Sequence, residues 1–377
     1  MLNNLLMAVL DTTLREGEQR WGIYFSAKVR REIVRRLVAL GVEEIELGTV
    51  GCHQDLVGLA AFVRELSPGL PVSVWAPLRT ADLRAAMSLG AVRLNLGVPV
   101  SPLQRERRLG LGRQELIKRV RRVVRFAADL FPYVSLGLED ASRTEKDFLL
   151  EVGHAAFSAG ARRLRLSDTL GILEPAEVMH LVRSFKESLP GVELAFHAHN
   201  DFGLASANAL TALSAGADWV DASVLGLGER AGIARLEEIL AYLYLRKGKI
   251  HYRIQLLPEI CHFVSWHAGD PCSEFKPIIG RKLFYCETGL HVEALYKTPA
   301  LYEPFPPELF GLERRLGLGA KSGRAALKRT LERLGLRLRR QELSVLLEEV
   351  RRRSRECGRP LSEKELRELA NKGKFVS

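Results

Sequence analysis

Cysteine is scarce in this chain, and the few cysteines that occur form no pair. Five are scattered over 377 residues, and no two stand at a Cys-x-x-Cys spacing. A disulfide framework needs an even, closely spaced set, and a structural zinc site needs such pairs. The sequence therefore predicts neither, and we expect a reducing, cytoplasmic location. The five residues are Cys52, Cys261, Cys272, Cys286 and Cys357.

Long apolar runs are absent too. No segment approaches the roughly 18 consecutive apolar residues that are needed to span a bilayer. The first residues, MLNNLLMAVLD, are partly apolar, but they lack a basic start and a small-residue cleavage site. We therefore expect neither a secretion signal nor a membrane partner.

Acidic residues are outnumbered by basic ones, which leaves a formal net charge of +11. Much of the excess lies in residues 119–125 and 337–353, where arginines alternate with apolar residues at helical spacing. Aromatic residues make up only 7% of the chain and do not interleave with these arginines as they do in a nucleic-acid stacking platform. We interpret the basic segments as solvated helix faces and expect no nucleic-acid partner. A positive field would instead concentrate anionic small molecules.

From residue 8 to about residue 230 the chain repeats one unit: a short β-rich run, a turn and a helix-patterned stretch. Ser26 and Thr80 are predicted N-caps, and Pro175 is the predicted first residue of a helix. Eight such alternations are typical of the α/β class and of a (β/α)8 TIM barrel, because a doubly wound sheet more often has five or six strands. The predicted strands are 8–14, 44–48, 72–76, 92–97, 133–138, 163–166, 193–198 and 219–224.

The repeat stops after residue 245. Residues 251–280 mix His, Trp, Pro and Cys without strand alternation, and residues 325–374 are rich in Arg, Glu and Leu. We expect two regions: a TIM-barrel catalytic domain at 1–250 and a smaller, mostly helical region at 251–377, with no further domain after it.

His197 and His199 end an apolar run and are separated by one residue. In a strand, residues i and i+2 point to the same side, so the two imidazoles converge. Glu16 follows the first predicted strand, and the C-terminal strand ends of a TIM barrel share one face. Two histidines and one carboxylate form a ligand set with open positions, which predicts a divalent cation, Mg²⁺, Mn²⁺, Zn²⁺ or Fe²⁺. The alternative is a pair of hydrogen-bonded histidines beside a strand-end salt bridge.

Other predicted strand ends carry polar side chains at the same rim. Glu46 ends the second strand, Glu139 ends the fifth and Thr169 follows the sixth, while Arg15 can stabilise an oxyanion. Each alone could form an ion pair or cap a helix, but their recurrence at one end favours an active site. The glycine-rich turn at 226–232 either binds phosphate through its N–H groups or is a tight turn.

Six motifs, taken in order, resemble the metal-dependent acyl-CoA condensing barrels, the family of homocitrate, isopropylmalate and citramalate synthases. The resemblance covers nearly the whole chain. It implies a Claisen condensation of acetyl-CoA with a 2-oxo acid, followed by thioester hydrolysis. It also implies a homodimer, with the helical region as a lid over the partner's barrel. The motifs are DTTLREGEQ at 11–19, EDASR at 139–143, SDTLG at 167–171, HAHNDFG at 197–203, GLGERAG at 226–232 and GLHVEAL at 289–295.

The resemblance assigns roles to the residues at the strand ends. Glu16, His197 and His199 correspond to the family's metal ligands. Arg15 corresponds to the arginine that binds substrate and stabilises the enolate or alkoxide, and Glu46 to a residue that transfers a proton. The expected mechanism uses the cation to make the 2-oxo carbon electrophilic and a base to generate the acetyl nucleophile.

Substrate binding and the lid are assigned in the same way. Gln19 and Thr169 match positions that contact the 2-oxo acid, and we expect Glu139 to bind substrate with them. The family's lid motif reads His-x-x-Gly-x-His, and here Cys286 stands in the first place. We therefore expect His291 to serve as the acid/base group, with Cys286 as the alternative.

The acceptor is the finer question. Ile233 stands where the isopropylmalate branch carries asparagine, as in many homocitrate synthases, and EDASR and SDTLGILEP most resemble the nitrogen-fixation homocitrate synthases. The expected acceptor is therefore 2-oxoglutarate, a 2-oxo dicarboxylic acid. Ser135 and Gly137 replace an arginine and a serine of the lysine-pathway enzymes, so its distal carboxylate must be held differently. The alternatives are an isopropylmalate or citramalate synthase and a catalytically silent paralogue that binds acyl-CoA or metal.

Overall fold

The computed structural model describes residues 7–53, 55–90 and 92–372. The chain divides into two compact units, Met1–Cys272 and Ser273–Ser377. Each unit is described by itself.

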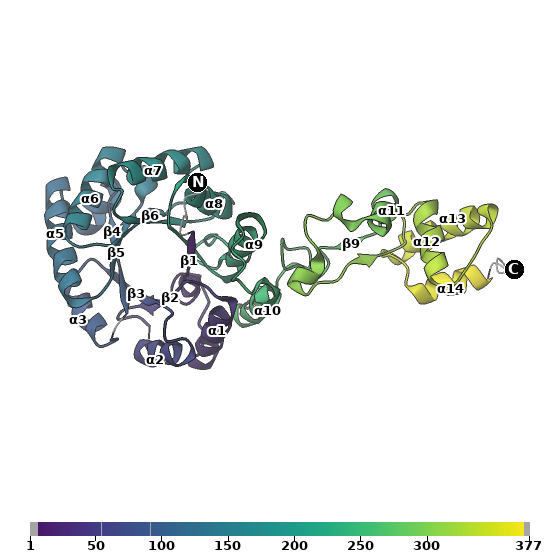
Figure 1. Ribbon diagram of the computed structural model, residues 1–377, viewed down its shortest axis with the longest axis horizontal. Helices are drawn as coiled ribbons and strands as arrows, with labels where there is room; N and C mark the ends of the chain where they lie inside the picture. Colours follow the sequence, from purple (N-terminus) through teal and green to yellow (C-terminus); the bar gives the residue numbers. More distant parts are fainter. Residues whose placement is uncertain (1–6, 54, 91, 373–377) are drawn as a thin grey trace. The chain divides into compact units, whose positions relative to one another are not determined.

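The first unit is a closed barrel of eight parallel strands that follow one another in chain order, with β8 pairing back onto β1. Figure 1 shows the ring of strands with the helices around it. The predicted TIM barrel is confirmed. The strands are β1 Ala8–Asp11, β2 Glu44–Thr49, β3 Val72–Pro77, β4 Arg93–Pro99, β5 Val134–Glu139, β6 Arg163–Asp168, β7 Glu193–Ala198 and β8 Trp219–Ala222.

Helices alternate with these strands as the repeat predicts. Ser26 caps α1, since its hydroxyl accepts a hydrogen bond from the Val29 N–H, and Pro175 begins α7. Thr80 is not an N-cap: it is the first residue of α3, and Arg79 holds the cap position in extended backbone. The helices are α1 Ala27–Leu40, α2 Leu56–Leu66, α3 Thr80–Met87, α4 Pro102–Gln104, α5 Arg113–Leu130, α6 Lys146–Ser158, α7 Pro175–Ser188, α8 Ala205–Ala215, α9 Leu236–Lys247 and α10 Leu257–Ala268.

The barrel interior holds charged side chains beside a small apolar cluster of Ala8, Leu10, Ala195 and Trp219, whereas the outer face of the strands is mainly apolar. In β6, Leu164 packs against α6, because a Cβ on Gly153 of that helix would lie 3.1 Å from its Cδ1. Arg163 points the other way and pairs across the barrel with Glu44 at 2.9 Å. Strand alternation therefore gives the helices an apolar surface and leaves the charged side chains to face one another inside.

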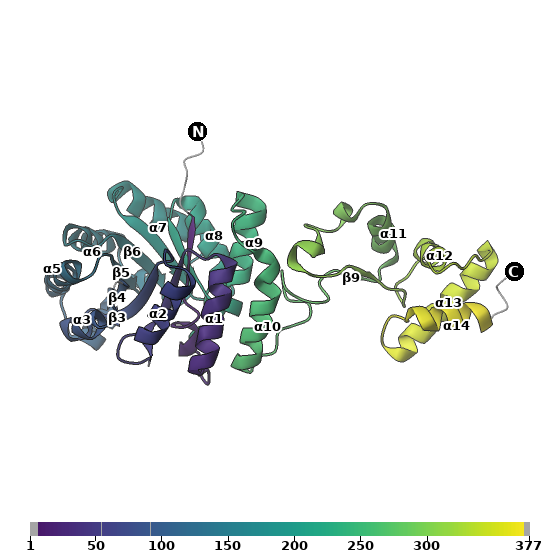
Figure 2. The ribbon, with the colours of Figure 1, turned by 60° about the horizontal axis from the view of Figure 1, so that its bottom comes forward.

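The first unit extends beyond the predicted boundary at residue 250. Helix α10 packs alongside α1, as Figure 2 shows, and the Arg36 guanidinium lies 4.2 Å from the centre of the Phe263 ring. This helix is therefore part of the barrel unit, which runs to Cys272.

The second unit is mostly helical, as predicted. A short parallel pair joins β9 Tyr285–Cys286 to β10 Arg315–Leu316, with one helix between the two strands in the sequence and three helices after them. The helices enclose a small apolar core containing Leu327, Leu346 and Val350. None of the described helices is long and apolar enough to cross a membrane. The helices are α11 Gly289–Lys297, α12 Arg324–Arg333, α13 Arg340–Cys357 and α14 Glu363–Lys372.

Candidate active site

The predicted ligand set comes together at the C-terminal mouth of the barrel. One ligand atom from each of Glu16, His197 and His199 lies within 4.8 Å of the others, and all three residues are buried. The Glu16 carboxylate oxygens lie 3.8 Å from His197 Nε2 and 4.0 Å from His199 Nε2. The two Nε2 atoms are 3.3 Å apart.

Glu16 is held by the glycine-rich turn that follows β8. The Glu229 N–H donates to Glu16 Oε1 at 3.2 Å, and a Cβ on Gly228 would lie 3.2 Å from the Glu16 Cγ. Gly232 has a φ of +86°, and a Cβ there would lie 1.9 Å from the Gly226 carbonyl oxygen. The turn is therefore a tight one, and one of its N–H groups is engaged by the Glu16 carboxylate.

Both histidines present Nε2 to the same point. The His197 Nδ1 lies 2.8 Å from Asp221 Oδ2, so a proton on Nδ1 leaves the lone pair on Nε2. Burial, together with neighbouring His197, lowers the pKa of His199 to about 4, so its ring is neutral at physiological pH. Neutral imidazoles beside a carboxylate are the form in which these groups bind metal, and the set fits a divalent cation.

Arg15 and Glu46 form a buried pair beside the ligand set. Arg15 Nε donates to Glu46 Oε2 at 2.6 Å, and its Nη1 donates to Glu16. Thr12 and Asn95 also donate to Glu46, each at 2.7 Å. Burial alone would raise the pKa of Glu46, but Arg15 and Arg165 hold it far below its usual range. A carboxylate with so many donors is a weak base, so these contacts favour a role in holding Arg15 over the predicted proton transfer.

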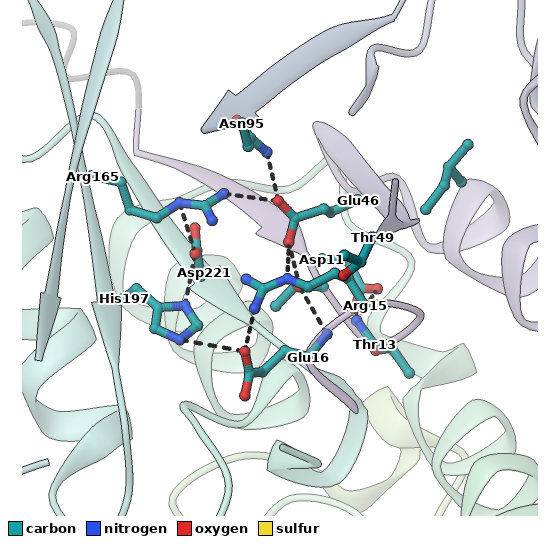
Figure 3. Close-up of polar contacts among 12 residues, drawn as sticks. Asp11, Thr13, Arg15, Glu16, Glu46, Thr49, Asn95, Arg165, His197 and Asp221 are labelled. Carbon is teal, nitrogen blue, oxygen red and sulfur yellow. Dashed lines mark hydrogen bonds and ion pairs between the residues drawn. The ribbon is translucent and has the colours of Figure 1, made fainter. Parts of the chain in front are cut away.

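Two charged residues of this site, Arg165 and Asp221, are absent from the set predicted from the sequence. Arg165 lies 3.3 Å from Glu46 Oε1 and 3.1 Å from Asp221 Oδ2, as Figure 3 shows. The sequence carries a signal for both. Arg163 and Arg165 alternate with leucines, and Asp221 is the charged residue of the short strand Trp219–Ala222. Strand alternation alone would have assigned these side chains to the barrel interior.

Glu139 is the last residue of β5, which lies between β4 and β6 in the barrel. Burial raises its pKa, while Arg108, Arg15 and His197 act against that rise. Arg108 is exposed and its Nη1 lies 3.4 Å from Glu139 Oε2. A Cβ on Gly97 would lie 2.5 Å from both Glu139 Oε1 and the Trp75 ring. Gly97 thus allows a carboxyl group and an aromatic ring to approach each other inside the barrel.

Gln19 and Thr169, both predicted to bind the 2-oxo acid, lie at the same rim. With its amide nitrogen toward Glu16, Gln19 is 3.0 Å from Glu16 Oε2. The Thr169 hydroxyl accepts a hydrogen bond from the Asp140 N–H at 2.8 Å. Thr169 is thus hydrogen-bonded to the residue that follows β5, and Gln19 lies against the predicted ligand Glu16.

The residues predicted for the lid belong to the second unit. His291 is exposed on α11, and its ring centre lies 4.1 Å from that of Tyr302. Cys286 is half-buried in β9. Their predicted role in catalysis stays a prediction.

Comparison with known proteins identifies the family. The family described as HMGL-like matches residues 7–264, more than half of the chain. The chain belongs to the HMGL-like family. This family depends on divalent metal, in keeping with the ligand set, and a second family, described as homocitrate synthase post-HMGL domain-like, matches residues 278–372.

Individual relatives agree on the class of reaction but not on the substrate. 2-Isopropylmalate synthase 2 of Caldanaerobacter subterraneus subsp. tengcongensis is 36% identical over 95% of this chain and 93% of the relative. Homocitrate synthase AksA of Methanothermobacter thermautotrophicus is 35% identical over 95% and 91%. The HMGL-like protein is therefore an enzyme, a transferase of the acyl-CoA condensing class.

A solved structure supports the same fold. The HMG-CoA lyase of Bacillus subtilis superimposes with a TM-score of 0.63 at 20% identity, over 70% of this chain and 94% of that one. The matched portion agrees in extent with the barrel unit.

Proposed function

We propose that this enzyme condenses acetyl-CoA with 2-oxoglutarate and water to give homocitrate and CoA. The observation that carries the proposal is the position of Arg15, which is buried directly beside three converging ligand atoms at the barrel mouth. A cation site and a fixed guanidinium together suit a reaction in which negative charge develops on carbonyl oxygens. The homocitrate synthase and the isopropylmalate synthase among the relatives support the reaction class.

Glu16, His197 and His199 would hold the cation, which when bound polarises the 2-oxo group of the acceptor. Arg15 donates to the oxygen on which charge develops, and Glu46 keeps its guanidinium in place. Burial raises the pKa of Glu139 at the same mouth, which favours its protonated form and suits a carboxyl group that donates a proton. Water then cleaves the thioester of the condensed product and releases CoA.

We assign the distal carboxylate of the acceptor to Arg108. Arg15 and Arg165 are already paired with buried carboxylates, whereas Arg108 is exposed and lies 3.4 Å from Glu139 Oε2. A second acidic group on the acceptor could replace this contact. Arg108 would thereby bind the distal carboxylate in place of the arginine that the lysine-pathway enzymes carry at the position of Ser135.

A second candidate is an acceptor with an apolar side chain, as in isopropylmalate or citramalate synthesis. The observation that favours it is the Trp75 ring beside Gly97, which offers an apolar surface inside the barrel. The third possibility, a silent paralogue that binds acyl-CoA or metal, rests on Cys286 in the lid motif.

An acceptor panel tests all three. Release of CoA thiol is measured with acetyl-CoA and 2-oxoglutarate, 2-oxoisovalerate or pyruvate, with Mn²⁺ present. We expect the highest kcat/KM with 2-oxoglutarate. The variant Arg108→Gln should raise the KM for 2-oxoglutarate by about tenfold or more, because a charge-assisted contact is lost. Arg107→Gln, an exposed neighbour, is the matched control.

The outcomes separate the candidates. Preference for 2-oxoisovalerate or pyruvate would replace homocitrate synthesis by the second candidate. No turnover with any acceptor at full metal occupancy would support the silent paralogue. We also propose the predicted homodimer, which light scattering of the full chain checks directly.

A further inference from the structure

Arg165 lies between two buried carboxylates that belong to different halves of the site. Its Nη2 is 3.3 Å from Glu46 Oε1, and its Nε is 3.1 Å from Asp221 Oδ2. Glu46 accepts from the substrate arginine Arg15, and Asp221 contacts Nδ1 of the ligand His197 at 2.8 Å. One guanidinium thus joins the oxyanion half of the site to the metal half, as Figure 3 shows.

These contacts close into a ring, because Arg15 also pairs with Glu16, and Glu16 faces His197 at 3.8 Å. Every side chain in the ring is less than a tenth exposed. Because water is excluded from these side chains, each charged group is stabilised mainly by its neighbours in the ring. Removing one side chain therefore changes the orientation of the side chains it contacts. The ring consists of Arg15, Glu16, His197, Asp221, Arg165 and Glu46.

We propose that Arg165 is a positioning residue that couples the orientation of His197 to that of Arg15. It orients Asp221, and through Asp221 the imidazole that binds metal; it also orients Glu46, and through Glu46 the substrate arginine. The inference rests on the proposed metal site and goes beyond it, since it assigns to Arg165 an effect on both metal binding and acceptor binding.

Arg163 distinguishes this role from a purely structural one. It lies two positions earlier on the same strand, is fully buried, and forms a bidentate pair with Glu44 at 2.9 and 3.0 Å. Its other hydrogen bonds go to Asn95 and Ser135. None of these partners is in the ring. Asn95 also donates to Glu46, so Arg163 reaches the ring only through Asn95, and none of its hydrogen bonds goes to Asp221 or His197.

The test measures Mn²⁺ affinity by titration calorimetry, without substrates, for the wild type and for Arg165→Met, Arg165→Lys and Arg163→Lys. We expect Arg165→Met to lose affinity by about 10- to 100-fold, as residues that orient metal ligands do on mutation. Arg165→Lys keeps the positive charge but cannot donate to both carboxylates with the planar guanidinium geometry, so we expect a smaller loss of Mn²⁺ affinity. Arg163→Lys should stay within about twofold of the wild type.

A second readout is the acceptor KM, which should also rise in Arg165→Met because Glu46, which holds Arg15, loses one of its own donors. Asn95→Ala removes a donor to Glu46 and an acceptor for Arg163, but no contact to Asp221 or His197. It should raise this KM and leave Mn²⁺ affinity unchanged.

Unchanged Mn²⁺ affinity in both Arg165 variants would overturn the inference, as would an equal loss in Arg163→Lys. If Arg165→Met does not fold, the two lysine variants decide; failure of Arg165→Lys alone to fold would make its role structural. Turnover failing in a wild type that binds Mn²⁺ contradicts the proposed reaction and not this inference. A wild type that binds no Mn²⁺ contradicts the proposed metal site itself.

Discussion

The backbone N–H of Glu229 donates a hydrogen bond to the Glu16 carboxylate at 3.2 Å, across 213 positions of the chain. Glu16 follows the first strand of the barrel and Glu229 follows the last. The turn after β8 therefore fixes the orientation of a ligand that the chain supplies at its beginning. A change in that turn should reach the metal site without touching a ligand.

Gly232→Ala should weaken metal binding and destabilise the barrel. Its φ of +86° and a Cβ 1.9 Å from the Gly226 oxygen force the turn to move, and with it the N–H that Glu16 accepts. We expect a loss of about 1–3 kcal/mol in the free energy of unfolding and weaker Mn²⁺ binding. Gly203→Ala is the control, since Gly203 has a φ of +77° but open space around its Cβ position. Equal effects of the two substitutions on Mn²⁺ affinity would contradict the prediction.

Removal of a ligand should abolish metal binding and turnover together. Glu16→Ala and His197→Ala each leave two ligands of three, and we expect Mn²⁺ affinity to fall by at least about 100-fold. His180→Ala, on the exposed face of α7, should bind Mn²⁺ as the wild type does. Calorimetry and thiol release are measured on the same preparations. A variant at Glu16 or His197 that is active and metal-replete would refute the site.

Asp11 should make the barrel less stable as pH rises. Burial raises the pKa of its carboxyl group from 3.8 to about 7, against hydrogen bonds from Thr13 that favour the charged form. Between these two values the folded state holds the proton more tightly than the unfolded state. The free energy of unfolding therefore falls with rising pH across this window, by at most about 4 kcal/mol for Asp11, and levels off above it.

Asp11→Asn isolates this contribution, because the amide does not titrate. Urea unfolding of the variant and the wild type at about pH 5 and about pH 8 should show the variant gaining relative stability at the higher pH. A difference between the two proteins that is independent of pH would show that Asp11 is ionised throughout.

His291 is the predicted acid/base group of the second unit. His291→Ala should lower kcat by about 10²- to 10⁴-fold, because alanine can neither donate nor accept a proton, while Mn²⁺ affinity stays at the wild-type value. Cys286→Ala should leave kcat within about twofold. The reverse pattern, with Cys286→Ala inactive and His291→Ala active, would move the role to the thiol.

The barrel and the ligand set follow from periodicity alone. The pairing of His197 with His199 needs only the two-residue repeat of a strand, and Glu16 needs only the rule that strand ends share a face. The ion pairs between charged side chains inside the barrel cannot be predicted in this way. They depend on how the strands are staggered once the barrel closes. Thus Arg165 was an unassigned polar residue in the sequence, and only the fold shows that it reaches both Glu46 and Asp221.

The chemical role of Glu46 could not be predicted from the sequence either. A glutamate at a strand end is a plausible base from its type and place, but its pKa depends on neighbours that lie far away in the sequence. Arg15, Arg165 and Asn95 converge on it from three different segments. The extent of the first unit escaped prediction for a related reason: α10 adds to the barrel without repeating the strand-and-helix unit.

The pairing of β1 with β8 sets an order of events during synthesis. The growing chain presents Glu16 early, both histidines only with β7, and the turn that orients Glu16 only after β8 has joined β1. A nascent or truncated chain that ends before β8 therefore lacks the turn that orients Glu16 toward the two histidines. At the proposed site, a cation would bind a set of ligands that only the closed barrel holds in place, so its binding would stabilise the finished barrel over earlier forms of the chain.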